Sequence, residues 1–360
     1  MKRFVLILFM LFFSLLLYSQ SFDQIKKVKV IPHTSIKNQK YTGTCWDFSG
    51  ISFIESELLR QTGKKYNLSE AYFMYYSYVE KAIDYVRWHG KMIFDWGGSP
   101  IDVIHLAQKY GIVRENDYPF TIYDSKPMIR KLHAYLDSIV KLKKISQNWM
   151  DGYKKILNKY LGTPPEYVYY RNKKYTPKEF MQNVLKFDPS QYIQITSFPF
   201  LPLYKPSIIP LIYNWDKTIS WNVTFSEFKT IIDTALNSGY SISALMDISE
   251  PGFNTYRSVV KLSRYKNSKM KADPWKFRQT EYDTYQTTDD HVMHVIGYGK
   301  DKSGNLFYLL KNSWGKRGDG QGYLFIREPY FEAKTISFLV NINAIPQEIR
   351  NKLCLNCVKP

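Results

Sequence analysis

The chain has 360 residues and 44% hydrophobic composition, and it carries a formal net charge of +18 at pH 7. This hydrophobic content supports a large buried core and excludes an intrinsically disordered chain, while the length allows one large domain or two modest ones. Three cysteines are too few for a scaffold built on disulfides. The core must therefore hold the fold together.

Residues 1–20 have the pattern of a secretory signal peptide. Lys2 and Arg3 precede a predominantly apolar run over residues 4–17, and short polar residues follow. The run is shorter than the ~20 residues that span a bilayer, which disfavours a membrane anchor. We expect a secreted or periplasmic protein with no stable membrane insertion, because signal cleavage removes the run and leaves a formal charge of +16.

Two of the three cysteines lie in the C-terminal tail, residues 351–360. Cys354 and Cys357 form a Cys-x-x-Cys pair that could close a disulfide, which leaves Cys45 as the single unpaired thiol. A free thiol in an exported protein is at risk of oxidation. Cys45 is therefore a candidate for a functional role.

Residues from about 33 to 120 are expected to form a helical region. Apolar residues recur at helical spacing after Cys45, and Gly63 marks a stop. Two further helices are expected to begin near Ser69 and Ser99. This pattern predicts that Cys45 lies at the N-terminus of a helix.

A mostly helical insertion is expected over residues from about 121 to 220. Long Lys-rich amphipathic stretches fill its first part. Thr176 and Glu179 match a capping box, and Thr224 with Glu227 matches a second one just beyond the insertion. Each box predicts the start of a short helix.

Residues from about 221 to 345 are expected to be rich in strands. After Gly239 the residues with strand character fall at 241–247, 291–297, 307–310 and 323–327. The chain therefore has helices first and strands last. This order predicts an α+β fold of two packed layers, with a helical N-terminal part and an antiparallel sheet or barrel in the C-terminal part.

Four separate residues match the parts of a thiol nucleophile site. Cys45 would be the nucleophile, and Gln39, six residues earlier, would donate its amide to the oxyanion. His291 would act as general acid and base, and Asn312 would fix the orientation of its ring. A helix N-terminus and an imidazolium both favour the thiolate, so we expect a thiolate–imidazolium pair at rest.

Each of these residues alone has a simpler explanation. A lone buried cysteine is usually an inert hydrophobe, and His294, three residues after His291, is expected to be packed or solvent-facing. The combination of four elements in one order is what indicates catalysis. No metal site and no cofactor are predicted, since the remaining histidines lack the spacing of ligands: His33, His89, His105 and His133.

These segments resemble papain-like cysteine peptidases, and among them the bleomycin hydrolase and aminopeptidase C branch. The similar elements are the Gln-x5-Cys-Trp motif, the Asp-His pair and the Asn-Ser-Trp-Gly motif. The resemblance implies catalytic roles for Cys45, His291, Asn312 and Gln39. It also implies substrate contacts in the cleft, which we assign to Gly97, Gly98, Trp46, Asp290 and Trp314.

Two features favour this branch over ordinary papains. Cys45 and His291 are 246 residues apart, against roughly 130–150 in papain-type enzymes, and the surplus matches the helical insertion. Thr42 also stands where papains have a disulfide cysteine. The resemblance covers residues 33–350 and implies one peptidase domain over residues 21–350.

The activity expected is hydrolysis of peptide bonds in a peptide or protein substrate through an acyl-enzyme. Members of this branch trim N-terminal residues because a C-terminal arm lies in the cleft, whereas this chain extends 11 residues past Ile349. We expect an aminopeptidase, with a papain-type endopeptidase as the alternative that this tail leaves open. The branch also implies a possible homo-oligomer.

A basic surface supports a second class of function. Clusters such as residues 141–144 and 171–174 could bind a nucleic acid or another polyanion weakly. Solvated helix faces explain the same clusters more simply. Binding of DNA that depends on salt would distinguish the two.

Overall fold

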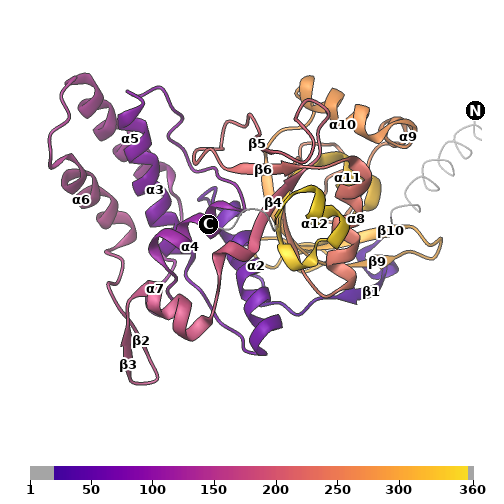
Figure 1. The fold of residues 1–360 in the computed structure, drawn as a ribbon, viewed down its shortest axis with the longest axis horizontal. Coiled ribbons are helices and arrows are strands. Elements are labelled where there is room, and N and C mark those ends of the chain that lie inside the picture. Colours follow the sequence, from indigo (N-terminus) through magenta and orange to yellow (C-terminus); the bar gives the residue numbers. More distant parts are fainter. Residues whose placement is uncertain (1–19, 356–360) are drawn as a thin grey trace, which may run out of the picture.

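The computed structural model describes residues 20–355, which form an α+β fold with helices at one end and a large sheet at the other (Figure 1). Residues 1–19 of the expected signal peptide and Cys357 lie outside the described residues. Within residues 20–355, no helix is both long and apolar enough to cross a bilayer. The α+β prediction is confirmed.

The helical end is built from the first part of the chain. In Figure 1, α3, α4, α5 and α6 lie together, and α2 lies between them and the sheet. The order along the chain is α2 (Cys45–Thr62), α3 (Glu70–Arg87), α4 (Asp102–Tyr110), α5 (Lys126–Lys141) and α6 (Trp149–Leu161). α2 and α3 begin where the sequence predicts, with Ser69 as the cap of α3, but α4 begins two residues after Pro100.

Helix α2 is the central element of the molecule. Every residue from Trp46 to Leu58 is buried, because the helix is covered by α3 and α4 on one side and by the sheet on the other. Gly50 allows the close approach of α4, since a Cβ atom there would lie 2.6 Å from Val103. Gly63 ends the helix in the left-handed region, as expected.

The predicted insertion over residues 121–220 is helical only in part. After α6 the chain forms β2 (Val168–Tyr170), β3 (Lys173–Tyr175), α7 (Pro177–Glu179), the π-helical turn η2 (Phe180–Leu185) and the turn η3 (Pro189–Gln191). Arg171 and Asn172 both have positive φ, as the two-residue turn between β2 and β3 requires. The predicted capping box at Thr176 is present.

The end of that span belongs to the main sheet, which corrects the helical prediction. β4 (Tyr192–Thr196) pairs with β12 (Thr335–Asn341), more than a hundred residues later. The short strands β5 (Pro206–Ile208) and β6 (Ile219–Asn222) then extend the sheet from β4. These strands have only three to five residues, and partners far away in the sequence stabilise them. Such short segments show too little hydrophobic periodicity to be recognised as strands from the sequence.

The main sheet is open and mixed. Its order is β5-β6-β4-β12-β7-β9-β10-β11-β8, with β1 (Lys26–Val30) also paired to β9. Most neighbours are antiparallel, but β4 with β6 and β11 with β8 are parallel, and the described residues form no closed barrel. The remaining strands are β7 (Ile242–Met246), β8 (Val259–Val260), β9 (His291–Lys300), β10 (Leu306–Lys311) and β11 (Tyr323–Arg327).

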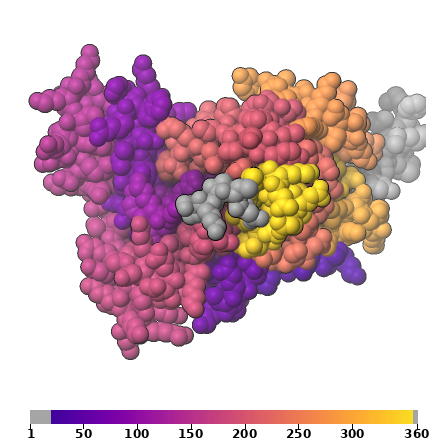
Figure 2. Space-filling view, viewed as in Figure 1, coloured from indigo at the N-terminus to yellow at the C-terminus, as the bar shows by residue number. Residues whose placement is uncertain are grey.

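The sheet separates two hydrophobic cores. Val292 of β9 packs into the core of the helical end, whereas the next residue, Met293, packs into the core on the other face. α8, α11 and α12 contribute to that second core, and Figure 2 shows the two ends as lobes of one surface. The other elements are η1 (Phe22–Gln24), α8 (Phe225–Asn237), α9 (Arg264–Ala272), α10 (Pro274–Asp283), α11 (Glu328–Lys334), η4 (Ile342–Ala344) and α12 (Gln347–Lys352).

Candidate active site

A cleft of about 500 Å³ lies where α2 meets β9. Cys45 is the first residue of α2 and His291 is the first residue of β9, and both line the cleft. The N-terminus of α2 points its unpaired N–H groups and the positive end of its dipole toward the thiol. The structure therefore brings together the nucleophile and the base that are 246 residues apart in the sequence.

The ring of His291 is held by Asn312, which follows the end of β10. His291 Nε2 lies 2.8 Å from Asn312 Oδ1, and the backbone N–H of Ser313 donates to the same oxygen over 2.8 Å. Because a backbone N–H can only donate, the shared atom is the amide oxygen. His291 Nε2 therefore carries the proton and Nδ1 keeps its lone pair, which is the form that can accept the thiol proton.

Ser313 also holds Gln39. The Ser313 hydroxyl donates to Gln39 Oε1 over 2.6 Å, and the backbone N–H of Gln39 donates to the Ser313 carbonyl over 2.8 Å. With Oε1 occupied, the NH2 group of this cleft-lining side chain is available to an oxyanion. Sequence reasoning assigned Gln39 but missed Ser313, although Ser313 stands inside the Asn-Ser-Trp-Gly motif.

Trp314 covers the base. Its ring lies 4.5 Å from the His291 ring, centroid to centroid, at an interplanar angle of 33°. Trp314 also lines the cleft, as expected from the sequence. The indole therefore limits water access to the hydrogen bond between His291 and Asn312, which strengthens that bond.

Gly97 and Gly98 form part of the cleft wall. Neither position has room for a side chain, because a Cβ atom would lie 2.2 Å from Tyr213 at Gly97 and 2.8 Å from Trp46 at Gly98. Lys81 of α3 fixes this segment, since its Nζ donates to the carbonyl of Gly97 over 2.6 Å. Sequence reasoning missed Lys81, which no local motif indicates.

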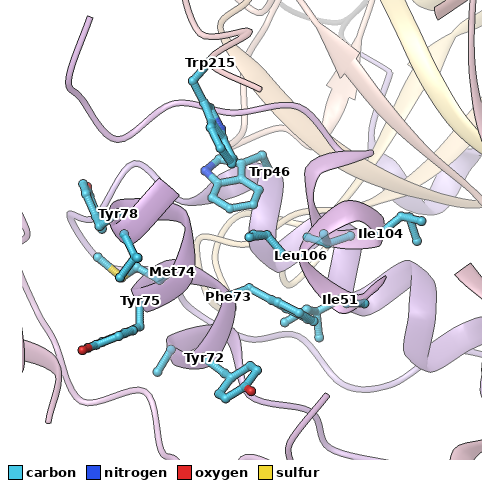
Figure 3. Packing of buried hydrophobic residues seen from close by; sticks show 14 of the residues in the cluster. Trp46, Ile51, Tyr72, Phe73, Met74, Tyr75, Tyr78, Ile104, Leu106 and Trp215 are labelled. Atoms are coloured by element: carbon cyan, nitrogen blue, oxygen red, sulfur yellow. The ribbon is translucent and has the colours of Figure 1, made fainter. Parts of the chain in front are cut away.

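Trp46 does not line the cleft, which corrects the substrate-binding role assigned from the sequence. The side chain is 0% exposed, and its indole N–H donates to the carbonyl of Trp96 over 3.0 Å. Figure 3 shows it in the helical core, beside Trp215. Trp46 instead supports the glycine segment from beneath.

Two adjacent carboxylates stand at the rim, on the segment that leads into β9. Asp290 is exposed and accepts from the Thr288 hydroxyl over 2.6 Å and from the Ile248 N–H over 3.2 Å. Asp289 also lines the cleft but is more buried, and burial raises its pKa to about 6. Only Asp290 was predicted as a cleft residue.

Burial opposes charge on both catalytic side chains. It raises the pKa of the Cys45 thiol to about 11, although backbone hydrogen bonds from Val292, Trp46 and Cys45 favour the thiolate. It lowers the pKa of His291 to about 4, although the hydrogen bond to Asn312 favours the imidazolium. Burial thus disfavours charge on each group taken alone, whereas a thiolate and an imidazolium would stabilise each other, and the thiolate–imidazolium pair at rest stays a prediction.

Two histidines outside the cleft have polar partners of their own. His294 is fully buried and its Nδ1 lies 2.8 Å from the Ser52 hydroxyl of α2, so it is packed. His105 Nδ1 pairs with Asp216 over 2.5 Å at the surface. Among residues 20–355, no group of three or more His, Cys, Asp or Glu side chains could hold a metal ion.

Comparison with known families agrees with this geometry. The Peptidase C1-like family matches residues 124–359, more than half of the chain, and the Papain family cysteine protease matches residues 18–184. The chain belongs to the Peptidase C1-like family. It is therefore a cysteine-type peptidase with a peptide or protein substrate, which confirms the resemblance seen in the sequence.

Individual relatives cover most of the chain. "Cysteine proteinase 1, mitochondrial" of Saccharomyces cerevisiae strain S288c is 23% identical, over 89% of this chain and 77% of its own length. "Aminopeptidase C" of Lactobacillus delbrueckii subsp. lactis is 20% identical, over 88% of this chain and 81% of its own length. Both relatives thus extend across the helical end and the sheet.

A solved structure shares the fold. The crystal structure of pepW from Lactobacillus rhamnosis HN001 superimposes with a TM-score of 0.71 at 19% sequence identity, covering 93% of this chain and 86% of that one. The papain-like fold predicted from the sequence is therefore confirmed.

Proposed function

We propose that this peptidase cleaves peptide bonds with Cys45 as nucleophile and His291 as general acid and base. The observation that carries the proposal is the connected set of hydrogen bonds from His291 through Asn312 and Ser313 to Gln39. The adjacent residues Asn312 and Ser313 thereby orient both the base and the oxyanion donor. Such mutual positioning is what nucleophilic catalysis requires.

The first half-reaction forms an acyl-enzyme. The sulfur of Cys45 attacks the carbonyl carbon, and His291 Nδ1 holds the proton that the thiol has given up. The Gln39 amide and the Cys45 backbone N–H receive the oxyanion, an effect on the order of 10²- to 10³-fold in rate. His291 then returns the proton to the leaving amine as the C–N bond breaks.

The second half-reaction releases the acid. Water attacks the acyl carbon while His291 Nδ1 takes one of its protons, and the oxyanion again faces Gln39. Collapse of the tetrahedral intermediate breaks the C–S bond, and the proton on His291 returns to the sulfur. Asn312 keeps the ring in place through both halves.

The activity proposed is that of an aminopeptidase, with a papain-type endopeptidase as the alternative. Support comes from the relatives named "Aminopeptidase C", which match 87–88% of this chain. Hydrolysis of an aminoacyl amide with a free amine tests the proposal. Turnover should be lost in Cys45→Ala and retained in the matched variant Cys354→Ala.

Alkylation identifies the nucleophile in the same experiment. Iodoacetamide should inactivate the enzyme with modification at Cys45, located by mass spectrometry, and prior incubation with substrate should slow the loss of activity. Normal turnover by Cys45→Ala would contradict the proposed mechanism.

Export is a separate part of the proposal. Its support is the sequence pattern of residues 1–20, and cleavage is expected near Ser19 or Ser21. N-terminal sequencing of the protein recovered from the periplasm or medium of an expressing bacterium should find a start near these residues. A full-length chain retained in the cytoplasm would contradict export.

A further inference from the structure

The segment between β5 and β6 closes one end of the catalytic cleft. Ile212 and Tyr213 line the cleft together with Cys45. The Tyr213 ring lies directly over Gly97, so closely that a Cβ atom there would overlap it at 2.2 Å. The glycine wall, where an extended peptide would lie against the backbone, is therefore covered at this end.

This segment is held in place by buried contacts. Trp215 is 6% exposed and packs beside Trp46 in the helical core, as Figure 3 shows. The Asn214 side chain accepts from both the N–H and the hydroxyl of Thr218, each over 2.8 Å. Tyr213 therefore lies in a turn that is held by packing and hydrogen bonds, and it shortens the cleft.

The closed end carries negative charge. Asp289 lines the cleft beside Tyr213, whose backbone N–H lies 3.4 Å from the Asp289 Oδ2 atom. Asp290 lies next to it at the rim. In the described part of the chain no Lys or Arg lines this cleft, although the whole chain carries +18.

A short cleft that ends in a carboxylate distinguishes the two ends of a peptide. Ion pairing favours the α-ammonium group of a chain N-terminus, whereas a C-terminal carboxylate would be repelled. A peptide that continues past this end would meet the Tyr213 ring instead. The geometry thus suits a substrate that begins inside the cleft.

We propose that Asp289 binds the free α-ammonium group of the substrate and that Tyr213 blocks longer chains at the same end. This inference rests on the proposed peptidase function and names its substrate class, peptides with an unblocked N-terminus. Selection of the free N-terminus comes from Tyr213, on the segment before β6, and from Asp289, on the segment before β9.

The test compares Asp289→Asn with the wild-type enzyme on a free aminoacyl amide and on its N-acetylated form. Loss of an ion pair should lower kcat/KM for the free amine by about 10- to 100-fold. The slow hydrolysis of the acetylated substrate should not fall. Asp283→Asn is the matched control, since Asp283 is an exposed carboxylate at the end of α10 that bonds to Gln279.

Iodoacetamide labelling of Cys45 distinguishes a failure of the Asp289 assignment from a failure of the proposed peptidase mechanism. Labelling that is unchanged in Asp289→Asn, with loss of free-amine turnover, supports the inference. Equal turnover of the free amine by both enzymes would overturn it while leaving the peptidase function intact. An active Cys45→Ala variant would instead overturn the peptidase mechanism.

A second variant tests the block itself. Tyr213→Gly should open the end of the cleft and raise hydrolysis of N-acetylated dipeptide amides relative to the free aminoacyl amide. An unchanged ratio would overturn the blocking role. Preference of wild-type enzyme for acetylated substrates with a lysine side chain would also overturn the inference, because Asp289 would then bind a side chain.

Discussion

The orientation of His291 depends on a single side chain. Asn312 Oδ1 accepts from His291 Nε2 and from the Ser313 N–H, so the proton on Nε2 is assigned by the hydrogen-bond pattern. Trp314 lies over this bond. A ring held in this way keeps Nδ1 free of the Asn312 bond, in the same cleft as the thiol.

Replacing Asn312 tests this role. Asn312→Ala should lower kcat by about 10- to 100-fold, because the imidazolium formed in the reaction loses a hydrogen bond of the charged type. KM should change little. Steady-state kinetics with an aminoacyl amide measures both. Asn237→Ala, at an exposed position at the end of α8, is the control, and an unchanged kcat in Asn312→Ala would contradict the assignment.

The ionisation of Asp289 should make kcat/KM depend on pH. Burial raises its pKa to about 6, with Asp290 as the neighbouring charge and the Tyr213 N–H facing it. The group is ionised above this pH and neutral below it, so kcat/KM for free-amine substrates should fall as pH decreases through about 6. Asp289→Asn should lack this pH dependence, and a dependence that persists in the variant would contradict the assignment.

The roles of individual residues were predictable where a local sequence motif surrounds them. Such motifs contain four of the site residues: Gln39, Cys45, His291 and Asn312. In the structure the first three line one cleft, and Asn312 is hydrogen-bonded to His291. Burial is not a local property, so the sequence could not show that Trp46 points inward. The same limit explains why the contact of Ser313 with Gln39, across 274 residues, was missed.

At the scale of elements, a buried lysine anchors the segment that leads into β9. Lys334, the last residue of α11, is 0% exposed and pairs with Glu250 over 2.7 Å and with Glu281 over 2.9 Å. It also donates to the Thr287 hydroxyl over 3.1 Å. These contacts fix the chain just before Asp289 and His291.

Removing this anchor should destabilise the protein. Lys334→Met removes the fully buried partner of Glu250 and Glu281, which still pair with Lys266, and should lower the free energy of unfolding by about 2 kcal/mol. Urea unfolding followed by circular dichroism measures the change. Lys217→Met, which removes an exposed pair with Asp84, should cost less than about 1 kcal/mol, and equal effects would contradict the role of burial.

Helices and strands were predictable where hydrophobic residues recur with a clear helical or strand periodicity. The helix from Cys45 and the strand from His291 lie where the sequence places them, with β9 extending to Lys300. The span 121–220 was predicted as mostly helical, yet β4 joins the main sheet through β12. Pairing between distant segments decides such strands, and one sequence does not reveal it.

At the scale of the whole molecule, α2 lies where the helical end meets the sheet (Figure 1). The cleft lined by Cys45 and His291 lies at this junction. α2 contributes Cys45 from one side and β9 contributes His291 from the other. Catalysis therefore requires both ends to pack correctly. The possible homo-oligomer and the weak binding of polyanions by the basic surface stay predictions.

The enzyme is expected to remove residues from the free N-terminus of a peptide, with Cys45 as the nucleophile. Mass spectrometry of the products from one decapeptide, supplied either free or N-acetylated, tests it most directly. We predict stepwise loss of N-terminal residues from the free peptide, slow or no cleavage of the acetylated peptide, and no cleavage of either by Cys45→Ala. Equal internal cleavage of both peptides, or turnover by Cys45→Ala, would contradict the account.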